Sequence, residues 1–158
     1  MSLGVEKMDD KIITFLLLAK KKTYAGKGAE EKPSRLKSHD LKYADGNLMY
    51  YDSYIGNDFF SGEEVLWMNE DPIWSMNYIG RVLDVSTFSG DFLKESLLLV
   101  NKDYPYRGPL YHKNEDYEYE MKVKGDFNWF IGSERILYKG KIIYECNFHG
   151  GIVKERKL

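Results

Sequence analysis

Two segments of this chain, residues 60–80 and 130–150, repeat a single pattern without a gap. At a constant offset of 70 residues, six positions carry the same residue in both segments. The six pairs are Phe60 and Phe130, Gly62 and Gly132, Glu64 and Glu134, Ile73 and Ile143, Asn77 and Asn147, and Gly80 and Gly150. Self-similarity at a fixed offset is typical of a duplicated supersecondary unit, so the repeat predicts two copies of one β-hairpin.

In the first half of the chain, the sequence predicts a helix, a loop and four strands. Asp9 or Asp10 can cap a helix that runs to about Lys21 and has a wide apolar face. The polar residues 23–38 lack periodicity and indicate a loop. Short apolar and aromatic segments separated by turn signals follow, which is typical of an antiparallel meander. These strands are predicted near residues 39–44, 48–55, 59–68 and 73–81.

The second half repeats this order of elements. Ser89 or Asp91 can start a helix that ends near Asn101. Four more strands are predicted near residues 110–113, 117–124, 127–138 and 141–149. Each half is therefore predicted to be an α-β-β-β-β unit. The units span residues 9–82 (repeat 1) and 89–151 (repeat 2), and a polar tail covers residues 152–158.

These elements predict an α+β fold with internal duplication, in a single domain covering residues 1–158. A helix followed by four antiparallel strands is the element order of the cystatin-like folds, in which a curved sheet wraps one face of the helix. A unit of about 70 residues makes only a modest core by itself. We therefore expect the two units to be fused face to face, with a pseudo-twofold axis as in a homodimer.

The composition narrows the class of protein. Apolar residues make up 43% of the 158 residues and charged residues 30%, which is typical of a soluble globular protein. The net charge is −2 and the basic residues are spread along the chain, which argues against nucleic-acid binding. No apolar run is long enough to span a bilayer, so no membrane association is expected. Cys146 is the only cysteine, which excludes an internal disulfide and favours a cytoplasmic location.

Aromatic residues are abundant, with 13 Tyr, 8 Phe and 3 Trp. Such residues favour strands with one buried face, and they also line small-molecule sites. Trp74, Tyr78 and Tyr144 lie on the aromatic face of the repeated hairpins. They are candidates for the wall of a cleft between the repeats.

Glu64 and Glu134 are the sharpest candidates for chemistry. Strand periodicity places each on the same face as an aliphatic neighbour, where a carboxylate is costly unless it is paired. If the two units face each other, the carboxylates converge near the axis, where they could transfer protons or bind a cation. The alternative is that each faces water or forms a local salt bridge, for example with Arg81 or Lys141.

Asn77 and Asn147 form a second repeated polar pair. An amide in a strand can orient a carbonyl or amine group of a ligand, whereas the structural alternative is a hydrogen bond to a neighbouring loop. His149 takes the place of Ile79 in the other copy, which makes it a candidate for a functional role. The histidines lack the spacing of a metal site, so neither a metal nor a cofactor is predicted.

The two loops that follow the predicted helices contain related residues. Tyr24 and Lys27 lie in the first loop, and Tyr104, Tyr106 and Arg107 lie in the second. Because both loops leave a helix at the corresponding point of each unit, these side chains could rim the mouth of a pocket.

Several segments of the chain resemble the DUF5680 family of uncharacterised bacterial domains. These segments are Phe15-Leu16, Tyr24–Gly28, Ser38–Leu41, Pro72–Tyr78, Phe88–Leu93, Tyr104–Pro109 and Tyr144–Gly151, within a resemblance that extends from about residue 12 to residue 151. The resemblance implies no known activity. Some members of the family are fused to a helix-turn-helix regulator of the XRE type. Too few residues precede the first predicted helix for such a domain, so the resemblance implies that any sensory role here is stand-alone or lost.

We therefore expect an effector site for a small molecule in an aromatic-lined cleft between the repeats, with binding rather than catalysis. The predicted ligand-binding residues are Glu64, Trp74, Asn77, Tyr78, Arg81, Glu134, Tyr144, Asn147 and His149. One alternative is an enzyme that uses Glu64, Glu134 or His149 for acid–base chemistry. Another is a protein–protein interaction module or a homo-oligomer that uses a sheet face or edge.

Overall fold

A computed structural model of the chain describes residues 2–156, with side chains from Asp9 onward, and these residues form two helices and eight strands. Helix α1 (Ser2–Lys22) precedes β1 (His39–Asp45), β2 (Leu48–Gly56), β3 (Phe59–Met68) and β4 (Asp71–Val82). Helix α2 (Gly90–Leu97) precedes β5 (Tyr111–Asn114), β6 (Tyr117–Asp126), β7 (Trp129–Tyr138) and β8 (Lys141–Ile152). The predicted order is confirmed, and every strand end lies within three residues of its predicted position.

The helix ends differ more from the prediction. Helix α1 begins at Ser2 rather than at a cap formed by Asp9 or Asp10. Helix α2 is capped as predicted by Ser89, whose hydroxyl accepts a hydrogen bond from the Phe92 amide at 3.1 Å, but it ends at Leu97. Leu98 and Leu99 form a turn rather than a third turn of the helix.

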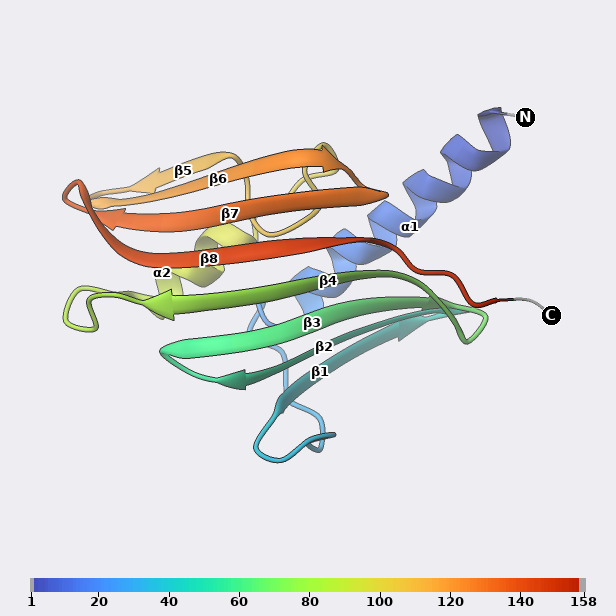
Figure 1. The fold of residues 1–158 in the computed structure, drawn as a ribbon, viewed down its shortest axis with the longest axis horizontal. Coiled ribbons are helices and arrows are strands. Elements are labelled where there is room, and N and C mark those ends of the chain that lie inside the picture. Colours follow the sequence, from blue (N-terminus) through green and yellow to red (C-terminus); the bar gives the residue numbers. More distant parts are fainter. Residues whose placement is uncertain (1, 157–158) are drawn as a thin grey trace.

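All eight strands form one antiparallel sheet in the order β1-β2-β3-β4-β8-β7-β6-β5 (Figure 1). The two halves meet edge to edge through β4 and β8, where Tyr78 lies opposite Phe148 and Asn77 lies opposite His149. The expectation of two units packed face to face is therefore wrong. Each meander ends in a strand with an unpaired edge, and pairing these two edges satisfies their backbone groups.

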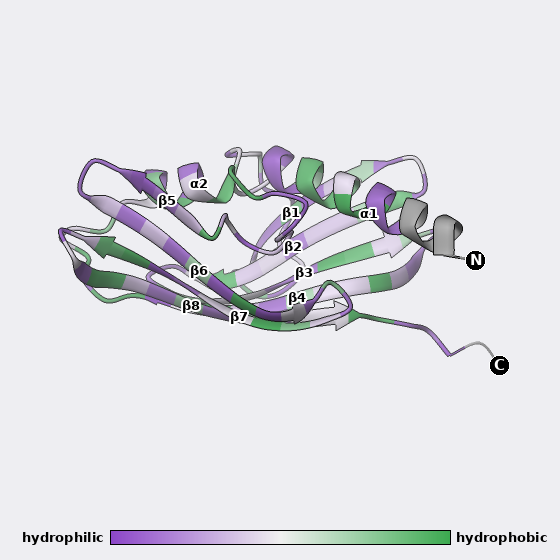
Figure 2. Cartoon of the chain, turned by 90° about the horizontal axis from the view of Figure 1, so that it is seen from above, coloured by the Kyte–Doolittle hydropathy of each residue, from purple (hydrophilic) through white to green (hydrophobic). Residues whose placement is uncertain are grey.

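Both helices lie on the concave face of the curved sheet, and its other face is left open (Figure 2). Strand periodicity divides the side chains between these faces. Leu16 and Ala19 of α1 are fully buried against the concave face. The largest buried side chains of that face are Tyr50, Leu66, Trp74, Met76, Tyr119, Ile136, Tyr144 and Phe148. Neither helix has the length and apolar character needed to cross a membrane in the part of the chain that the structure describes.

Tight turns fix the register of the hairpins. The β1–β2 turn contains Gly46 at φ 60°, and the β7–β8 turn contains Lys139 at φ 49° and Gly140 at φ 79°. Positive φ values at both central residues of a two-residue turn match the right-handed twist of the flanking strands. Asn69 and Glu70 adopt the same conformation between β3 and β4, with φ values of 50° and 69°. The two repeated hairpins therefore share one turn geometry.

The loop between α1 and β1 is held by a carboxylate at the outer strand. Asp40 is fully buried and accepts hydrogen bonds from the Ser34 amide at 2.8 Å and from the hydroxyls of Tyr51 at 2.7 Å and Ser53 at 2.8 Å. Burial alone would raise the pKa of Asp40, but these hydrogen bonds hold it well below its usual range. Asp40 therefore stabilises the loop at neutral pH.

Candidate functional site

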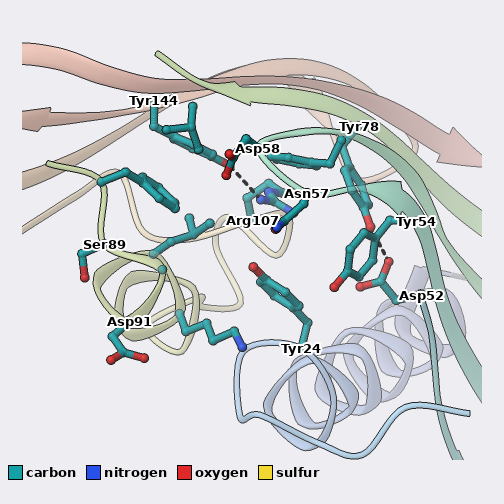
Figure 3. A pocket seen from close by; sticks show the side chains of 16 residues that line it. Tyr24, Asp52, Tyr54, Asn57, Asp58, Tyr78, Ser89, Asp91, Arg107 and Tyr144 are labelled. Atoms are coloured by element: carbon teal, nitrogen blue, oxygen red, sulfur yellow. Dashed lines mark hydrogen bonds between the residues drawn. The ribbon is translucent and has the colours of Figure 1, made fainter. Parts of the chain in front are cut away.

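A cavity of about 460 Å³ lies on the concave face, between the central strands of the sheet and α2. Both halves of the chain contribute to its wall (Figure 3). Its polar and aromatic lining includes Tyr24, Asp52, Tyr54, Tyr78, Arg107 and Tyr144. The cavity is thus the aromatic cleft of the fold, and the geometry of its polar groups decides what it can bind.

Three stacked rings form one wall of the cavity. The ring of Tyr144 lies between those of Phe60 and Phe88, with centroid distances of 6.1 and 5.5 Å and interplanar angles of 14° and 21°. Phe60 comes from β3 and Tyr144 from β8, so this stack crosses the junction between the halves. Offset stacking of this kind fixes ring positions and presents a flat apolar surface.

Glu134 on β7 has hydrogen-bond donors on both carboxylate oxygens. Its Oε1 accepts from Arg107, at 3.0 Å from Nε and 2.6 Å from Nη2, and from the Tyr144 hydroxyl at 2.8 Å. Its Oε2 accepts from the Tyr119 hydroxyl. Glu134 and Arg107 are both buried. Buried ion pairs are stable only when additional hydrogen bonds satisfy the remaining acceptors. Both oxygens of Glu134 are satisfied in this way, so the cluster has a structural role.

Glu64 on β3 has fewer partners. Its Oε1 accepts from Lys20 Nζ at 2.7 Å and from the Tyr50 hydroxyl. Lys20 Nζ also donates to the carbonyl of Tyr106 at 2.5 Å. No residue in the described range donates to Glu64 Oε2. Each of the two glutamates is paired with a cation of its own, Glu64 with Lys20 and Glu134 with Arg107.

Arg81 and Lys141, which were considered as local salt-bridge partners of the glutamates, pair with other carboxylates in the structure. Arg81 pairs with Glu145 at 2.6 Å on the exposed side of the sheet. Lys141 approaches Asp84 at 3.7 Å. The cations that bind the buried glutamates come instead from α1 and from the loop after α2, which sequence alone does not place against the sheet.

Asp52 on β2 is the buried carboxylate that lines the cavity. It is 5% exposed and lies opposite Glu64 in the β2–β3 register. Its Oδ1 accepts from the Tyr78 hydroxyl at 2.6 Å. Its Oδ2 accepts no hydrogen bond from the described residues and points toward the cavity beside Tyr54 (Figure 3). Burial, and next the charge of Glu64, raise the pKa of Asp52 to about 7.

A glycine makes room for the tyrosine that binds Asp52. Gly62 lies opposite Tyr78 in the β3–β4 register, and a Cβ atom at Gly62 would stand 2.4 Å from the Tyr78 hydroxyl oxygen. Gly132 lies in the same way opposite Phe148, and a Cβ there would stand 2.4 Å from the Phe148 ring. The repeated glycine therefore allows an aromatic ring to lie across the neighbouring strand in both halves.

The second half places apolar side chains where the first half has Asp52 and Tyr78. Met121 lies opposite Glu134 as Asp52 lies opposite Glu64, and Phe148 follows Tyr78 by 70 residues. Met121 and Phe148 are both buried. The fold therefore accepts an apolar pair at these positions, and the polar pair beside the cavity is not a requirement of the architecture.

The nine residues predicted to form the site separate into three groups. Tyr78 and Tyr144 line the cavity. Glu64 and Glu134 are buried on the same face and bound to Lys20 and Arg107 as described. Trp74 is also buried on this face, but its indole N–H donates to the Phe127 carbonyl at 3.0 Å, and the ring is a core side chain.

The other four predicted residues, Asn77, Arg81, Asn147 and His149, lie on the open face. Asn77 is opposite His149, and Arg81 is opposite Glu145, across the central β4–β8 pair. Asn147, Arg81 and His149 are exposed. Their strands place them between the buried residues at every second position, so they do not meet the glutamates or the cavity.

Several residues of the cavity were not among the predicted site residues. Asp52 had a signal in the sequence, because it alternates with Leu48, Tyr50 and Tyr54 on one face of a strand. Tyr24 and Arg107 line the cavity from the two loops that follow the helices. This agrees with their predicted place at a pocket mouth, whereas Lys27 pairs with Asp91 at 2.9 Å on the surface.

In the region that the structure describes, no group of three or more His, Cys, Asp or Glu side chains could hold a metal ion. Cys146 is buried behind the cavity wall, and burial raises the pKa of its thiol to about 12. Among the residues that line the cavity, Asp52 is the one whose pKa is raised to near neutral pH.

The comparison with protein families gives one match. A family described as "Domain of unknown function (DUF5680)" matches residues 52–153. The matched range begins at Asp52 and contains β3, β4 and the whole second half. The resemblance noted from the sequence is thereby confirmed. Neither the curated proteins nor the solved structures contain a match to this chain.

Proposed function

The chain belongs to the DUF5680 family, whose description names no activity, and we propose that it binds a small organic molecule in its cavity. The observation that carries the proposal is the make-up of the cavity wall, where aromatic rings surround one buried carboxylate with an unused acceptor oxygen. Small-molecule sites typically have volumes of about 300–1,000 Å³ and combine apolar walls with a few polar groups that orient the ligand. This cavity, at about 460 Å³, has that character.

The tyrosines near Asp52 add further hydrogen-bonding capacity. The hydroxyls of Tyr24 and Tyr54 make no hydrogen bond within residues 9–156, although both rings line the cavity. Their rings meet edge to face at 5.9 Å. A phenol both donates and accepts, so a bound molecule can be oriented by two hydroxyls and one carboxylate.

Ligand binding is tested by native mass spectrometry and by thermal unfolding against a library of small aromatic and cyclic metabolites. A compound at about 100 times its Kd stabilises the native state by about 2.7 kcal/mol. We expect such a compound to raise the unfolding midpoint of the wild type and of Tyr111→Ala, whose tyrosine is exposed on β5. The same compound should act weakly on Tyr54→Ala. A purified protein without bound mass, together with no stabilising compound, would contradict the proposal.

We also propose that the sheet arose by duplication of one α-β-β-β-β unit around a pseudo-twofold axis. The register supports this idea, because Tyr78 lies opposite Phe148, its own counterpart 70 residues later. In this proposal, a local axis between these two residues relates β4 to β8. Expression of residues 89–151 alone tests the idea, because a single unit would then pair its free β8 edge with a second copy.

Acid–base catalysis is a second candidate function, favoured by Asp52 rather than by the glutamates. A carboxyl group with a pKa of about 7 can both accept and donate a proton at neutral pH. Glu64 and Glu134 form salt bridges with Lys20 and Arg107, and His149 lies on the open face. Any turnover found should show a pH–rate limb near 7 that disappears in Asp52→Asn. Turnover that survives Asp52→Asn would reject this role.

Protein association through the open face is a third candidate. Phe59, Ile79, Trp129 and Ile131 are between 60% and 81% exposed there, and exposed apolar side chains can take part in association. Light scattering of the wild type and of Ile79→Lys with Ile131→Lys tests this candidate. A strict monomer in both cases would reject self-association.

A further inference from the structure

We propose that the ligand of the cavity is an organic cation, a protonated amine on a flat apolar body, whose ammonium group binds Asp52 Oδ2. The inference rests on the proposed small-molecule function and names the ligand class. Three observations carry it: the charge of the buried cluster, the position of the unused oxygen, and the rings around that oxygen.

The buried charges around the cavity do not balance. The cluster contains three carboxylates and two cations, namely Asp52, Glu64, Glu134, Lys20 and Arg107. Lys20 pairs with Glu64 and Arg107 pairs with Glu134. Asp52 is left without a cation, and its bond to Tyr78 is a hydrogen bond from a neutral phenol. Because buried charges are normally paired, one positive charge would complete the cluster when Asp52 is ionised.

The groups that face Asp52 from the surrounding elements leave that charge uncompensated. Glu64 faces it from β3 and Tyr78 from β4, and Tyr24 lies near it at the end of α1. Arg107 and Lys20 act on it from farther away, and neither forms an ion pair with it. At the mouth of the cavity, the exposed Asp58 adds a negative charge, Asp91 is paired with Lys27, and Lys94 of α2 lies over the ring of Tyr24.

The rings beside Asp52 suit an ammonium group. A cation over the face of a tyrosine is attracted by the ring quadrupole, and the ring of Tyr24 already holds Lys94 Nζ at 4.8 Å from its centroid. The stack of Phe60, Tyr144 and Phe88 offers a flat apolar surface to the body of the ligand. One carboxylate oxygen is too few for a calcium or magnesium ion, which takes six or more oxygen ligands, but it is enough for an amine.

The second half of the chain argues that the free carboxylate serves a ligand rather than the fold. Met121 and Phe148 lie at the corresponding positions, and both of these apolar side chains are buried. Burial of a carboxylate is a cost to stability, and the Oδ2 atom of Asp52 is open to the cavity with no donor from the described residues. The geometry at Asp52 is therefore explained by a partner that is not part of the chain.

The assignment is tested with three probes of similar shape: phenethylamine as the cation, phenethyl alcohol as the neutral analogue and hydrocinnamate as the anion. Binding is followed by NMR shifts of the tyrosine ring signals, with the Asp52 carboxyl signal as an independent readout. We expect the amine to bind the wild type at least about tenfold more tightly than the alcohol. The preference should fall by up to about tenfold for each pH unit below the Asp52 titration midpoint.

Variants separate the roles of charge and fold. Asp52→Asn keeps an oxygen for Tyr78 and should abolish the preference for the amine. Glu145→Gln removes the same charge from the open face and should leave the preference intact. If Asp52→Asn does not fold, Asp52→Met with Tyr78→Phe installs the side chains that the chain already uses at the corresponding positions of the second half.

The outcomes distinguish this inference from the proposed function. Equal binding of the three probes, or an amine preference that survives Asp52→Asn, overturns the cation assignment and leaves small-molecule binding in place. Binding of none of the probes, with no shift of the Asp52 titration, counts against both. A shift of the Asp52 titration by calcium or magnesium alone, with loss of amine binding, overturns the assignment in favour of a metal ion.

Discussion

Glu134 and Glu64 occupy corresponding positions of the two halves, yet their surroundings differ. Glu134 has donors on both oxygens, and Arg107 binds it through two nitrogen atoms. Glu64 has donors on one oxygen within the described residues, and its cation, Lys20, is shared with a backbone carbonyl. The second half thus contains a completed ion pair, whereas the first half keeps unused acceptor capacity next to the cavity.

The neighbours of the two glutamates extend this difference. Met121 lies opposite Glu134, and Asp52 lies opposite Glu64. A buried carboxylate beside another carboxylate is destabilising, and the apolar alternative is present in the same chain. The second cluster therefore serves stability, whereas the first cluster gives up some stability for a polar group in the cavity.

The largest effect is expected when the completed cluster is broken. Glu134→Ala leaves Arg107 buried without its carboxylate and removes the acceptor of two tyrosine hydroxyls. We expect the free energy of unfolding to fall by about 3–5 kcal/mol, measured by urea denaturation.

The matched control for this prediction is Glu145→Ala, which removes the exposed partner of Arg81. An exposed pair contributes about 0–1 kcal/mol. If both variants lost the same small amount, the Glu134 cluster would not be the structural unit described here.

A smaller loss is expected from the corresponding change in the first half. Lys20→Met removes the cation of Glu64 and leaves two adjacent carboxylates, Asp52 and Glu64. We expect a loss of about 2–3 kcal/mol, less than for Glu134→Ala because Lys20 makes only one hydrogen bond to Glu64 and the Tyr50 hydroxyl remains as a donor. Urea denaturation of Lys20→Met and of Lys21→Met, whose lysine is exposed on α1, measures the difference. A loss as large as that of Glu134→Ala would remove the contrast between the halves.

The fold could be predicted largely from local signals. Turn residues such as Gly46 and Gly140, which adopt positive φ values, mark the ends of strands, and alternation of apolar residues marks the strands themselves. The joining of β4 to β8 could not be predicted in this way. Both edges are free after each meander forms, and local sequence does not state whether two units pair at their edges or stack their faces.

The site was predicted less well, for two physical reasons. Asn77 and Tyr78 are neighbours in sequence, but strand periodicity sends them to opposite faces, so a list of repeated polar and aromatic residues mixes two surfaces. Asp52 becomes unusual only through its partner Glu64 across β2 and β3 and through the missing cation. That information lies in the register and in the placement of Lys20 on α1, neither of which is local.

A moderate gain in stability is expected when the first half is made to match the second. The double variant Asp52→Met with Tyr78→Phe replaces the polar pair by the side chains found at Met121 and Phe148. Replacing a buried polar pair by apolar residues of similar size is often neutral or stabilising by about 1–4 kcal/mol, and we expect about 1–2 kcal/mol here at neutral pH. Thermal and urea unfolding measure the gain, and a clear loss of stability would mean that the polar pair supports the fold.

The smallest effect, taken over one pH unit, is the dependence of stability on pH through Asp52. In the unfolded chain this carboxyl releases its proton near pH 3.8, whereas in the native protein it keeps the proton until about pH 7. Between these values the native state binds more protons than the unfolded state, so the contribution of Asp52 to stability falls as pH rises. The slope for one proton is at most about 1.4 kcal/mol per pH unit.

Asp40 has the opposite sign, because its pKa is lowered in the native state and its contribution is lost as pH falls. The pH dependence of the wild-type stability therefore contains contributions from both Asp40 and Asp52. The difference in stability between the wild type and Asp52→Asn isolates the contribution of Asp52. We expect Asp52→Asn to gain on the wild type steadily from about pH 4 to about pH 7 and to keep a constant difference above that range. Parallel curves for the two proteins would show that Asp52 ionises freely, and the contrast with Met121 would then lose its electrostatic basis.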